Sequence, residues 1–346
     1  MSLHSGTASV EWSHLVTTPT TRVVVTGGAG FLGTLLAREL LAGPVTLNGA
    51  DPVEVDDLVL VDLSAPRPDL AADERVTVVT GDLADIVERL APATAIFHLA
   101  GVVSGAAEAD FDLGMRTNLD ATRRVLQYAR GHDELPLMVF SSSLAVYGRD
   151  PALGPVGAVD DDTLPRPQSS YGIQKFIGEQ LVADYTRKGF VRGRSVRLMT
   201  VSVRPGKPNA AASSFLSGII REPLAGEPSV CPVPPDTPVA LSSPGRSIEG
   251  LLRAASSGEG EWGSRTAMNL PALTTTPREM AEALDRVAGA GTSRKIAWEN
   301  DPAIVAIVGS WPARFHAARA ARLGLEPEPD FDAIVRSYIT EMRRQA

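Results

Sequence analysis

Cysteine is nearly absent from the sequence, since Cys231 is the only one among 346 residues. One cysteine cannot form an internal disulfide and cannot build a metal centre from several thiolates, so we expect no metal site. Chains without disulfides are typical of reducing compartments. We therefore expect a cytoplasmic protein stabilised by its hydrophobic core, which a chain of this length can make large in one or two domains.

Long apolar runs and an excess of basic residues are also missing. No stretch is long and apolar enough to span a membrane. Residues 1–20 lack a basic segment followed by an apolar run, so we expect a polar leader and no signal peptide. The net charge is -8, with 33 Lys and Arg against 41 Asp and Glu. This balance disfavours a nucleic-acid or membrane partner, but it permits a small anionic ligand in a local positive pocket.

The most informative stretch covers residues 23–41 and reads VVVTGGAGFLGTLLARELL. An apolar run typical of a buried strand is followed by a glycine-rich turn and then by leucines at helical spacing. Gly27 would allow the tight turn, Gly30 the approach of a pyrophosphate, and Gly33 the close packing of helix on strand. The pattern predicts a dinucleotide cradle, and the alternative is an ordinary glycine-rich loop.

A second apolar strand, LVLVD, ends in Asp62. In a dinucleotide-binding fold an acid at this place contacts the adenosine ribose hydroxyls. Its charge would repel a 2′-phosphate, so the sequence favours NAD over NADP. The alternative for Asp62 is a helix N-cap or a solvated carboxylate. Phe31 and Leu32, which follow the glycine-rich turn, are expected to contact the same cofactor.

Strands and helices alternate along the next part of the chain. Four further strands are expected at residues 76–79, 95–100, 137–141 and 196–203. Helices are expected at 119–130, which Asn118 opens, and at 171–188, whereas 102–109 reads as a loop. This alternation predicts an α/β fold with a parallel, doubly wound Rossmann-type sheet.

The composition changes after Arg204, where Pro, Gly and Ser become frequent. This change predicts a smaller C-terminal substrate-binding region that closes over the first domain. We expect residues 21–203 to form the NAD-binding domain, residues 204–346 to be mostly substrate-binding, and residues 238–258 to return to the first domain.

Tyr171 and Lys175 are spaced i, i+4 on one expected helix, so their side chains share a face. Upstream, Ser141 and Ser143 belong to a serine run that ends a strand. A nearby ammonium stabilises a phenolate, so the tyrosine can act as a base while a serine hydroxyl holds the substrate oxygen. Because Y-x-x-x-K also recurs by chance, a surface helix with a packed tyrosine is the alternative.

The motifs TGGAGFLG, GDLAD, HLAG, SSSLAVYG and YGIQK, in this order, resemble the extended short-chain dehydrogenase/reductase superfamily, which contains the nucleotide-sugar epimerases. The resemblance covers residues 21–340. It implies catalytic roles for Ser143, Tyr171 and Lys175, and a homodimer formed through the helices that begin near Asn118 and Tyr171. It also implies cofactor contacts at Asp82, Leu83, Leu99, Ala100, Gly101, Asn118, Ser141, Tyr171 and Lys175.

Two segments, AGVVSGAAEADFDLGMRTNLDATR and VRPGKPNAAASSFLSGIIREPLAGE, resemble members of this superfamily that oxidise the C2 hydroxyl of a short sugar acid with NAD. Arg204 or Lys207 could hold the carboxylate of such a small anionic substrate. Ser104, Ser213 and Ser214 could contact it, with Ser143 holding the reacting hydroxyl. The alternative for this cluster is a solvated basic loop.

A nucleotide-sugar 4-epimerase that keeps its NAD tightly bound is the second hypothesis. Such enzymes usually carry an Arg-Asp-aromatic run where this chain reads PVALSSPGR, and Arg246 is displaced into the start of a helix. A sensor of NAD without catalysis is the third hypothesis, although it would need none of the catalytic residues. His98 lies inside an apolar run, so we expect a core histidine there and not a catalyst.

Overall fold

The computed structural model describes residues 20–345, so residues 1–19 of the predicted leader lie outside the described residues. Its centre is a seven-stranded sheet in the order β10-β6-β5-β4-β1-β2-β3, and every neighbouring pair is parallel. The predicted α/β fold class is therefore confirmed. The strands are β1 (Arg22–Thr26), β2 (Asp57–Asp62), β3 (Val76–Thr80), β4 (Ala95–His98), β5 (Leu137–Ser143), β6 (Arg192–Leu198) and β10 (Met268–Asn269).

The strand order reverses direction at the β1–β4 pair, where chain connections leave to opposite sides. In such sheets ligands bind beyond the carboxyl ends of the strands at this switch point. The strands β1, β2, β4 and β5 are buried on both faces, and the residues of β4 and the central residues of β1 are fully covered. This burial explains why their sequences are continuous apolar runs without alternation.

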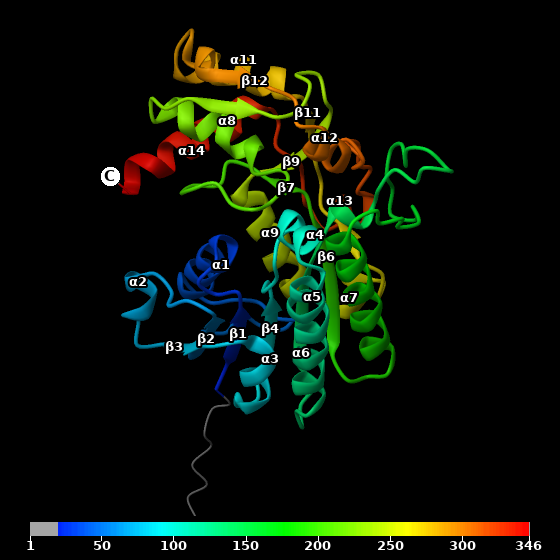
Figure 1. The fold of residues 1–346 in the computed structure, drawn as a ribbon. Coiled ribbons are helices and arrows are strands. Elements are labelled where there is room, and N and C mark those ends of the chain that lie inside the picture. The colour runs from blue at the N-terminus through cyan, green and yellow to red at the C-terminus, as the bar shows by residue number, and fades with distance from the viewer. Residues whose placement is uncertain (1–19, 346) are drawn as a thin grey trace, which may run out of the picture.

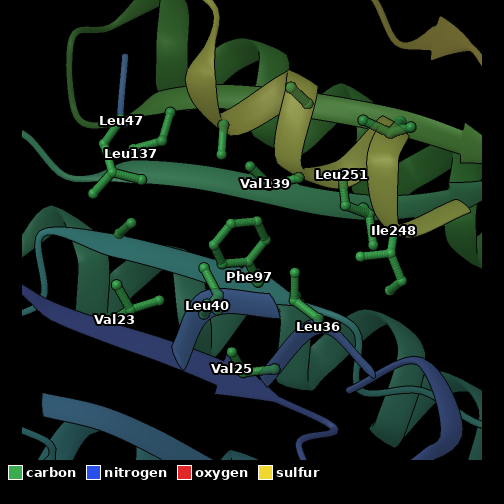
Figure 2. Packing of buried hydrophobic residues seen from close by; sticks show 14 of the residues in the cluster. Val23, Val25, Leu36, Leu40, Leu47, Phe97, Leu137, Val139, Ile248 and Leu251 are labelled. Atoms are coloured by element: carbon green, nitrogen blue, oxygen red, sulfur yellow. The ribbon is translucent and has the colours of Figure 1, made fainter. Parts of the chain in front are cut away.

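Helices cover both faces of the sheet (Figure 1). On one face α1 (Phe31–Leu41) and α9 (Pro244–Ser256) pack their leucines against β1, β4 and β5, as Figure 2 shows around Phe97. On the other face lie α6 (Ala121–Arg130) and α7 (Ser170–Arg187). The remaining helical segments of this lobe are α2 (Pro68–Ala71), α3 (Leu83–Ile86), η1 (Val87–Arg89), α4 (Ser104–Ala109), α5 (Phe111–Gly114), η2 (Met115–Asp120), η3 (Leu144–Val146), α10 (Glu259–Trp262) and α13 (Ala318–Arg322).

A smaller lobe with its own core sits over the carboxyl edge of the sheet (Figure 1). It holds two small sheets, β11-β9-β7 and β12-β8. Its elements are β7 (Thr200–Val201), α8 (Phe215–Leu224), β8 (Ser229–Cys231), β9 (Val239–Ser242), β11 (Leu273–Thr275), α11 (Pro277–Ala288), η4 (Thr292–Lys295), β12 (Ile296–Trp298), α12 (Pro302–Val308) and α14 (Phe331–Gln345). No helix among residues 20–345 is long and apolar enough to cross a membrane.

Three local expectations are wrong. The expected strand 196–203 is divided between β6, in the large sheet, and β7, in a small one. The expected loop at 102–109 contains helix α4, which its sequence SGAAEA supports. Asn118 does not open a helix but lies inside one, in a π-helical turn between α5 and α6. The N-terminal cap of this helix is Asp110, at the start of α5.

His98 is a core histidine, as expected. Its ring is fully buried on β4, with Nδ1 2.7 Å from Thr26 Oγ1 and Nε2 2.9 Å from Thr122 Oγ1. Burial, together with the smaller effect of the nearby charge of Lys175, lowers the pKa of His98 to about 3. The histidine is therefore neutral and joins β4 to α6.

Candidate active site

The glycine-rich turn lies between β1 and α1 and leaves the start of α1 open. Gly30 is the N-cap of α1, and no side chain caps the helix. A Cβ on Gly33 would lie only 2.0 Å from the Gly27 carbonyl oxygen, so α1 packs too closely on the turn for any larger residue. An uncapped helix N-terminus with this close approach fits the pyrophosphate of a dinucleotide.

Asp62 ends β2 next to this turn. Its carboxylate accepts hydrogen bonds from the backbone N–H groups of Ala29, at 3.1 Å, and Ser64, at 3.3 Å. The side chain therefore holds the glycine-rich turn and still reaches the carboxyl edge of the sheet, the place where an adenosine ribose would lie. Asp62 is no helix N-cap, which removes one of the alternatives.

Other predicted cofactor residues follow β3 and β4 at the same edge. Asp82 caps α3 by accepting a hydrogen bond from the Ala84 N–H at 3.0 Å, and Leu83 is buried beneath it. The Leu99 N–H donates to the Thr26 carbonyl at 3.1 Å, and the Ala100 N–H donates to Thr26 Oγ1 at 3.3 Å. These bonds hold the segment after β4 beside the glycine-rich turn.

Asn118 connects the segment after β4 to α7. Its Oδ1 accepts a hydrogen bond from the Val102 N–H at 2.9 Å, and its Nδ2 donates to Gln174 Oε1 at 2.8 Å. A Cβ on Gly101 would lie 2.8 Å from Asn118 Oδ1 and 3.6 Å from Lys175 Nζ. Three of the predicted residues, from three separate elements, therefore meet at one point.

Ser141, Ser143, Tyr171 and Lys175 lie together where β5 meets α7. Lys175 Nζ donates to the Ser141 carbonyl at 2.8 Å and lies 5.8 Å from the centre of the Tyr171 ring. The Ser143 hydroxyl is hydrogen bonded to the Tyr171 phenol. Lys175 is 4% exposed, so its ammonium is held within the lobe and not on a solvated helix face. The arrangement can hold a hydroxyl group and move its proton.

Burial dominates the ionisation of both titratable groups. It raises the pKa of Tyr171 to about 12, against a smaller lowering by the Ser143 hydrogen bond. It lowers the pKa of Lys175 to about 8, against a raising by the charge of Glu179. We expected Lys175 to lower the pKa of Tyr171, but here the net shift of Tyr171 is upward because desolvation of the phenolate exceeds the stabilisation it receives.

A cavity of about 230 Å³ opens in front of Ser143 and Tyr171, between the two lobes. The predicted substrate residues Ser104, Arg204, Ser213 and Ser214 line it, together with the predicted cofactor residues Leu32 and Ser141. Ser104 is not in a loop as expected but starts α4, where its Oγ accepts a hydrogen bond from the Ala212 N–H at 3.3 Å.

Among the predicted substrate residues, Lys207 alone does not line this cavity. Lys207 is exposed on the loop after β7 and is not among the lining residues, because the chain turns outward at Pro205 and Gly206. Of the two predicted carboxylate anchors, the structure therefore brings only Arg204 to the cavity. Phe31 lines a separate groove between α1, α9 and α14.

Arg204 carries a positive charge that faces the cavity, and none of the described residues supplies a counterion. Its backbone N–H donates to Ser217 Oγ at 2.9 Å and its carbonyl accepts from Arg221 Nη1 at 2.8 Å. Within residues 20–345 no group hydrogen bonds or pairs with its guanidinium. Burial lowers the pKa of Arg204, and the charge of Arg221 lowers it further. An anion in the cavity would supply the missing partner.

Sequence reasoning missed Arg221, Ser217, Asn209, Thr200 and Trp311, which also line the cavity. A signal for two of them was present in the sequence. Ser214, Ser217 and Arg221 follow one another at spacings of three and four residues, so on α8 they form one polar face among apolar residues. Trp311 lies almost a hundred residues further on, in a segment whose pattern gives no such sign.

Comparison with known proteins assigns the chain. The model of the NAD dependent epimerase/dehydratase family matches residues 23–240. The chain belongs to this family. Curated relatives include a D-erythronate dehydrogenase of Cupriavidus necator, 52% identical over 92% of this chain and 98% of that protein. A D-erythronate dehydrogenase of Haemophilus influenzae is 41% identical over the same shares, 92% and 98%.

Solved structures of the NAD dependent epimerase/dehydratase fold agree with this assignment. A nucleoside-diphosphate-sugar epimerase of Agrobacterium tumefaciens superposes with a TM-score of 0.84 at 36% identity, covering 97% of each chain. An L-threonine dehydrogenase of Cupriavidus necator superposes with a TM-score of 0.77 at 21% identity, covering 93% of this chain and 99% of that one, which shows the shared fold alone. The family resemblance inferred from the sequence motifs is confirmed.

Proposed function

We propose that the protein is an NAD-dependent dehydrogenase that oxidises the C2 hydroxyl of D-erythronate to the 2-oxo acid. The observation that carries this proposal is a small cavity lined by Ser143, Tyr171 and Arg204. Among the described residues, none pairs with the Arg204 guanidinium. Such a cavity suits a short hydroxy acid, whose carboxylate and reacting hydroxyl are only a bond or two apart. The names of the two curated relatives support the choice of acid.

NAD fits the residues at the carboxyl edge of the sheet. The uncapped start of α1 would hold the pyrophosphate, and Asp62 would contact the adenosine ribose. We assign further contacts to Gly27, Gly30, Gly33, Asp82, Leu83, Leu99, Ala100, Gly101, Asn118 and Ser141. When bound, NAD⁺ accepts a hydride and adds a positive charge beside Tyr171. That charge favours the phenolate form, which burial alone disfavours.

The chain's own residues would handle the substrate proton and orientation. Arg204 would bind the carboxylate, and Arg221 would keep its backbone in place through the Arg204 carbonyl. Ser143 would hold the C2 hydroxyl oxygen. Tyr171 would take the hydroxyl proton, while Lys175, fixed on the Ser141 carbonyl, would stabilise the resulting phenolate.

A nucleotide-sugar 4-epimerase is the second candidate, because the similar Agrobacterium tumefaciens protein is named a nucleoside-diphosphate-sugar epimerase. The volume of the cavity disfavours it, since about 230 Å³ lies below the roughly 300–1,000 Å³ typical of sites for drug-sized ligands. A nucleotide sugar is larger still, and its anionic diphosphate would need more positive charge than Arg204 supplies, since Arg221, the other arginine at the cavity, is paired with Glu222.

Assembly and location form part of the same proposal. We propose a homodimer through α7 and the continuous helix of α5, η2 and α6, which contains Asn118, because Phe111, Ile173 and Ile177 are 60%, 46% and 36% exposed there. We propose a cytoplasmic location on the strength of the single cysteine. Residues 21–203 would serve as the NAD-binding domain and residues 204–346 mostly as the substrate-binding region, with 238–258 returning through α9.

The direct test measures NADH formation from NAD⁺ and single substrates. D-Erythronate, L-erythronate, D- and L-threonate, a hexuronate and UDP-glucose are supplied separately. We expect D-erythronate to give the fastest rate and Tyr171→Phe to abolish it. Conversion of UDP-glucose to its C4 epimer without net NADH, with no oxidation of any acid, would assign the protein to the epimerases instead.

A further inference from the structure

Glu179 and Arg197 form an ion pair buried behind the proposed catalytic residues. Arg197 Nη2 lies 2.7 Å from Glu179 Oε2, and Arg197 Nε lies 2.8 Å from Glu179 Oε1. The side chains are only 6% and 1% exposed, which makes this the most buried ion pair in the described part of the chain. Burying two charges has a high desolvation cost, and apolar residues of the same size often fold as well. Stability alone therefore does not account for the pair.

The position of Glu179 connects it to the site. Tyr171, Lys175 and Glu179 follow one another at four-residue spacing and share one face of α7. Glu179 Oε1 also accepts a hydrogen bond from the Ser142 hydroxyl at 2.5 Å. Ser142 lies between Ser141, whose carbonyl accepts from Lys175, and Ser143. The carboxylate is thus one helical turn from the ammonium and directly bonded to the strand that holds it.

Arg197 is fixed on its other side by buried polar groups. Its Nη1 donates to the Tyr147 hydroxyl at 2.5 Å, and that hydroxyl donates to Asn269 Oδ1 at 3.1 Å. Tyr147 is fully buried, and protein groups alone complete this chain of hydrogen bonds. With both ends hydrogen bonded, the two side chains and their charges are held in one place.

Few other charges reach Lys175. The groups within the site are Tyr171 on its own helix and the neutral His98 on β4, with Arg197 on β6 behind Glu179. Arg194 on β6 donates to the Ala254 carbonyl on the opposite face of the sheet. The remaining charged residues on the helices packed against α7 are exposed and screened by solvent: Glu108, Asp112, Arg116, Asp120, Arg123, Arg124 and Arg130.

We propose that Glu179 and Arg197 are a positioning pair whose fixed charges set the protonation state of Lys175 and hence the pH range in which the site works. The catalytic role of Lys175 rests on the function proposed above, but its ionisation does not. Burial lowers the pKa of Lys175 to about 8 and the charge of Glu179 opposes this, so Glu179 keeps the ammonium protonated near neutral pH.

The sign of each substitution follows from electrostatics. Glu179→Gln removes a negative charge one helical turn away, so the pKa of Lys175 should fall by about one pH unit. Arg197→Met leaves the negative charge uncompensated, so the pKa should rise. Ser142→Ala is the control, because it removes the hydrogen bond to Glu179 and leaves both charges. It should not move the pKa.

The test is an NMR titration of lysine labelled with ¹³C at Cε, in the full-length protein freed of nucleotide. The chain has only four lysines, Lys175, Lys188, Lys207 and Lys295, so Lys175 is assigned by its loss in Lys175→Met. We expect opposite shifts in Glu179→Gln and Arg197→Met. Equal pKa values in wild type, Glu179→Gln and Arg197→Met would overturn the proposal.

Breaking a buried pair can prevent folding. The double variant Glu179→Gln/Arg197→Met leaves no unpaired charge and covers that case. Because Glu179 is nearer to Lys175, the pKa should still fall, by less than in Glu179→Gln. An unchanged pKa in the double variant would contradict the proposal.

The pH profile of NADH formation gives a second readout. In Glu179→Gln both limbs should move to lower pH, because loss of a negative charge lowers the pKa of Tyr171 and of Lys175 alike. If no acid is oxidised at all but the lysine titration shifts as expected, the proposed function fails while the positioning pair stands.

Discussion

At the scale of one residue, the buried ammonium of Lys175 lowers the stability of the folded protein. Its ammonium is buried because it must reach the Ser141 carbonyl beside Tyr171. Burial lowers its pKa from 10.5 to about 8. Each pH unit of such a shift is worth about 1.4 kcal/mol, so holding the charge in the folded state costs about 3 kcal/mol below pH 8.

Lys175→Met should therefore be inactive yet more stable than wild type near pH 7, by about 1–3 kcal/mol in the free energy of unfolding. Between about pH 8 and 10.5 the folded state of the wild type has lost this proton while the unfolded state keeps it, so wild-type stability rises with pH. Urea unfolding at about pH 7 and pH 9.5 checks both points. A stability difference that does not shrink at the higher pH would contradict the argument.

Asp62 accepts a hydrogen bond from the glycine-rich turn, and we propose that its charge sets the preference for NAD over NADP. Asp62→Asn keeps an oxygen that can accept from the Ala29 N–H, but it removes the charge facing the ribose. We expect the variant to bind NAD about tenfold more weakly and NADP more tightly than wild type. The preference for NAD over NADP would therefore be smaller. Titration calorimetry with each dinucleotide measures this, and an unchanged ratio of the two dissociation constants would rule out the role.

At the scale of elements, helix α4 contacts the loop that contains Ala210 and Ala212, and this contact lies around Gly105. A Cβ on Gly105 of α4 would lie 2.2 Å from the Ala210 carbonyl oxygen. Because that atom belongs to the backbone, Gly105→Ala must push the loop that carries Ser213 and Ser214 away from α4. Ser104 next to it bonds the same loop through the Ala212 N–H.

Gly105→Ala should raise KM for the acid about tenfold or more, through displaced substrate contacts, and should leave the dissociation constant of NAD nearly unchanged. Gly260→Ala in α10 is the matched control, since nothing lies within 4 Å of its added Cβ. Steady-state kinetics and NAD binding on both variants decide the matter. Equal KM values for the two variants would show that the contact does not shape the site.

The elements with strong local patterns could be predicted from the sequence, and those defined by tertiary contacts could not. The strands β1, β2 and β4 could be predicted from their apolar runs. The shared helix face of Tyr171 and Lys175 could be predicted from their four-residue spacing. The end of β6 could not be predicted, because the chain continues as an extended strand and only pairing with β9 assigns Thr200 and Val201 to another sheet. Lys207 and Arg204 look equivalent in sequence, and only the path of the loop after β7 separates them.

At the scale of the whole molecule, the proposed dimer interface is formed by apolar side chains exposed on α5 and α7. Ile173 and Ile177 are spaced i, i+4 and form one exposed stripe on α7, and Phe111 is exposed on α5, which packs against α7. Ile173→Asp/Ile177→Asp should yield monomers by light scattering, because a dimer interface would bury the new charges. Leu153→Asp, at a residue 69% exposed on a distant loop, is the control and should leave the dimer intact. A wild-type monomer would refute the proposed assembly.

The central claim concerns the whole molecule, in which the two lobes bring an anion-binding arginine to a proton-transfer pair. The most direct measurement supplies D-erythronate deuterated at C2 with NAD⁺ and analyses the nucleotide by mass spectrometry. The account predicts NADH that carries the deuterium, formed more slowly than from unlabelled acid and not formed by Tyr171→Phe. Unlabelled NADH, or no NADH while UDP-glucose is epimerised, would contradict it.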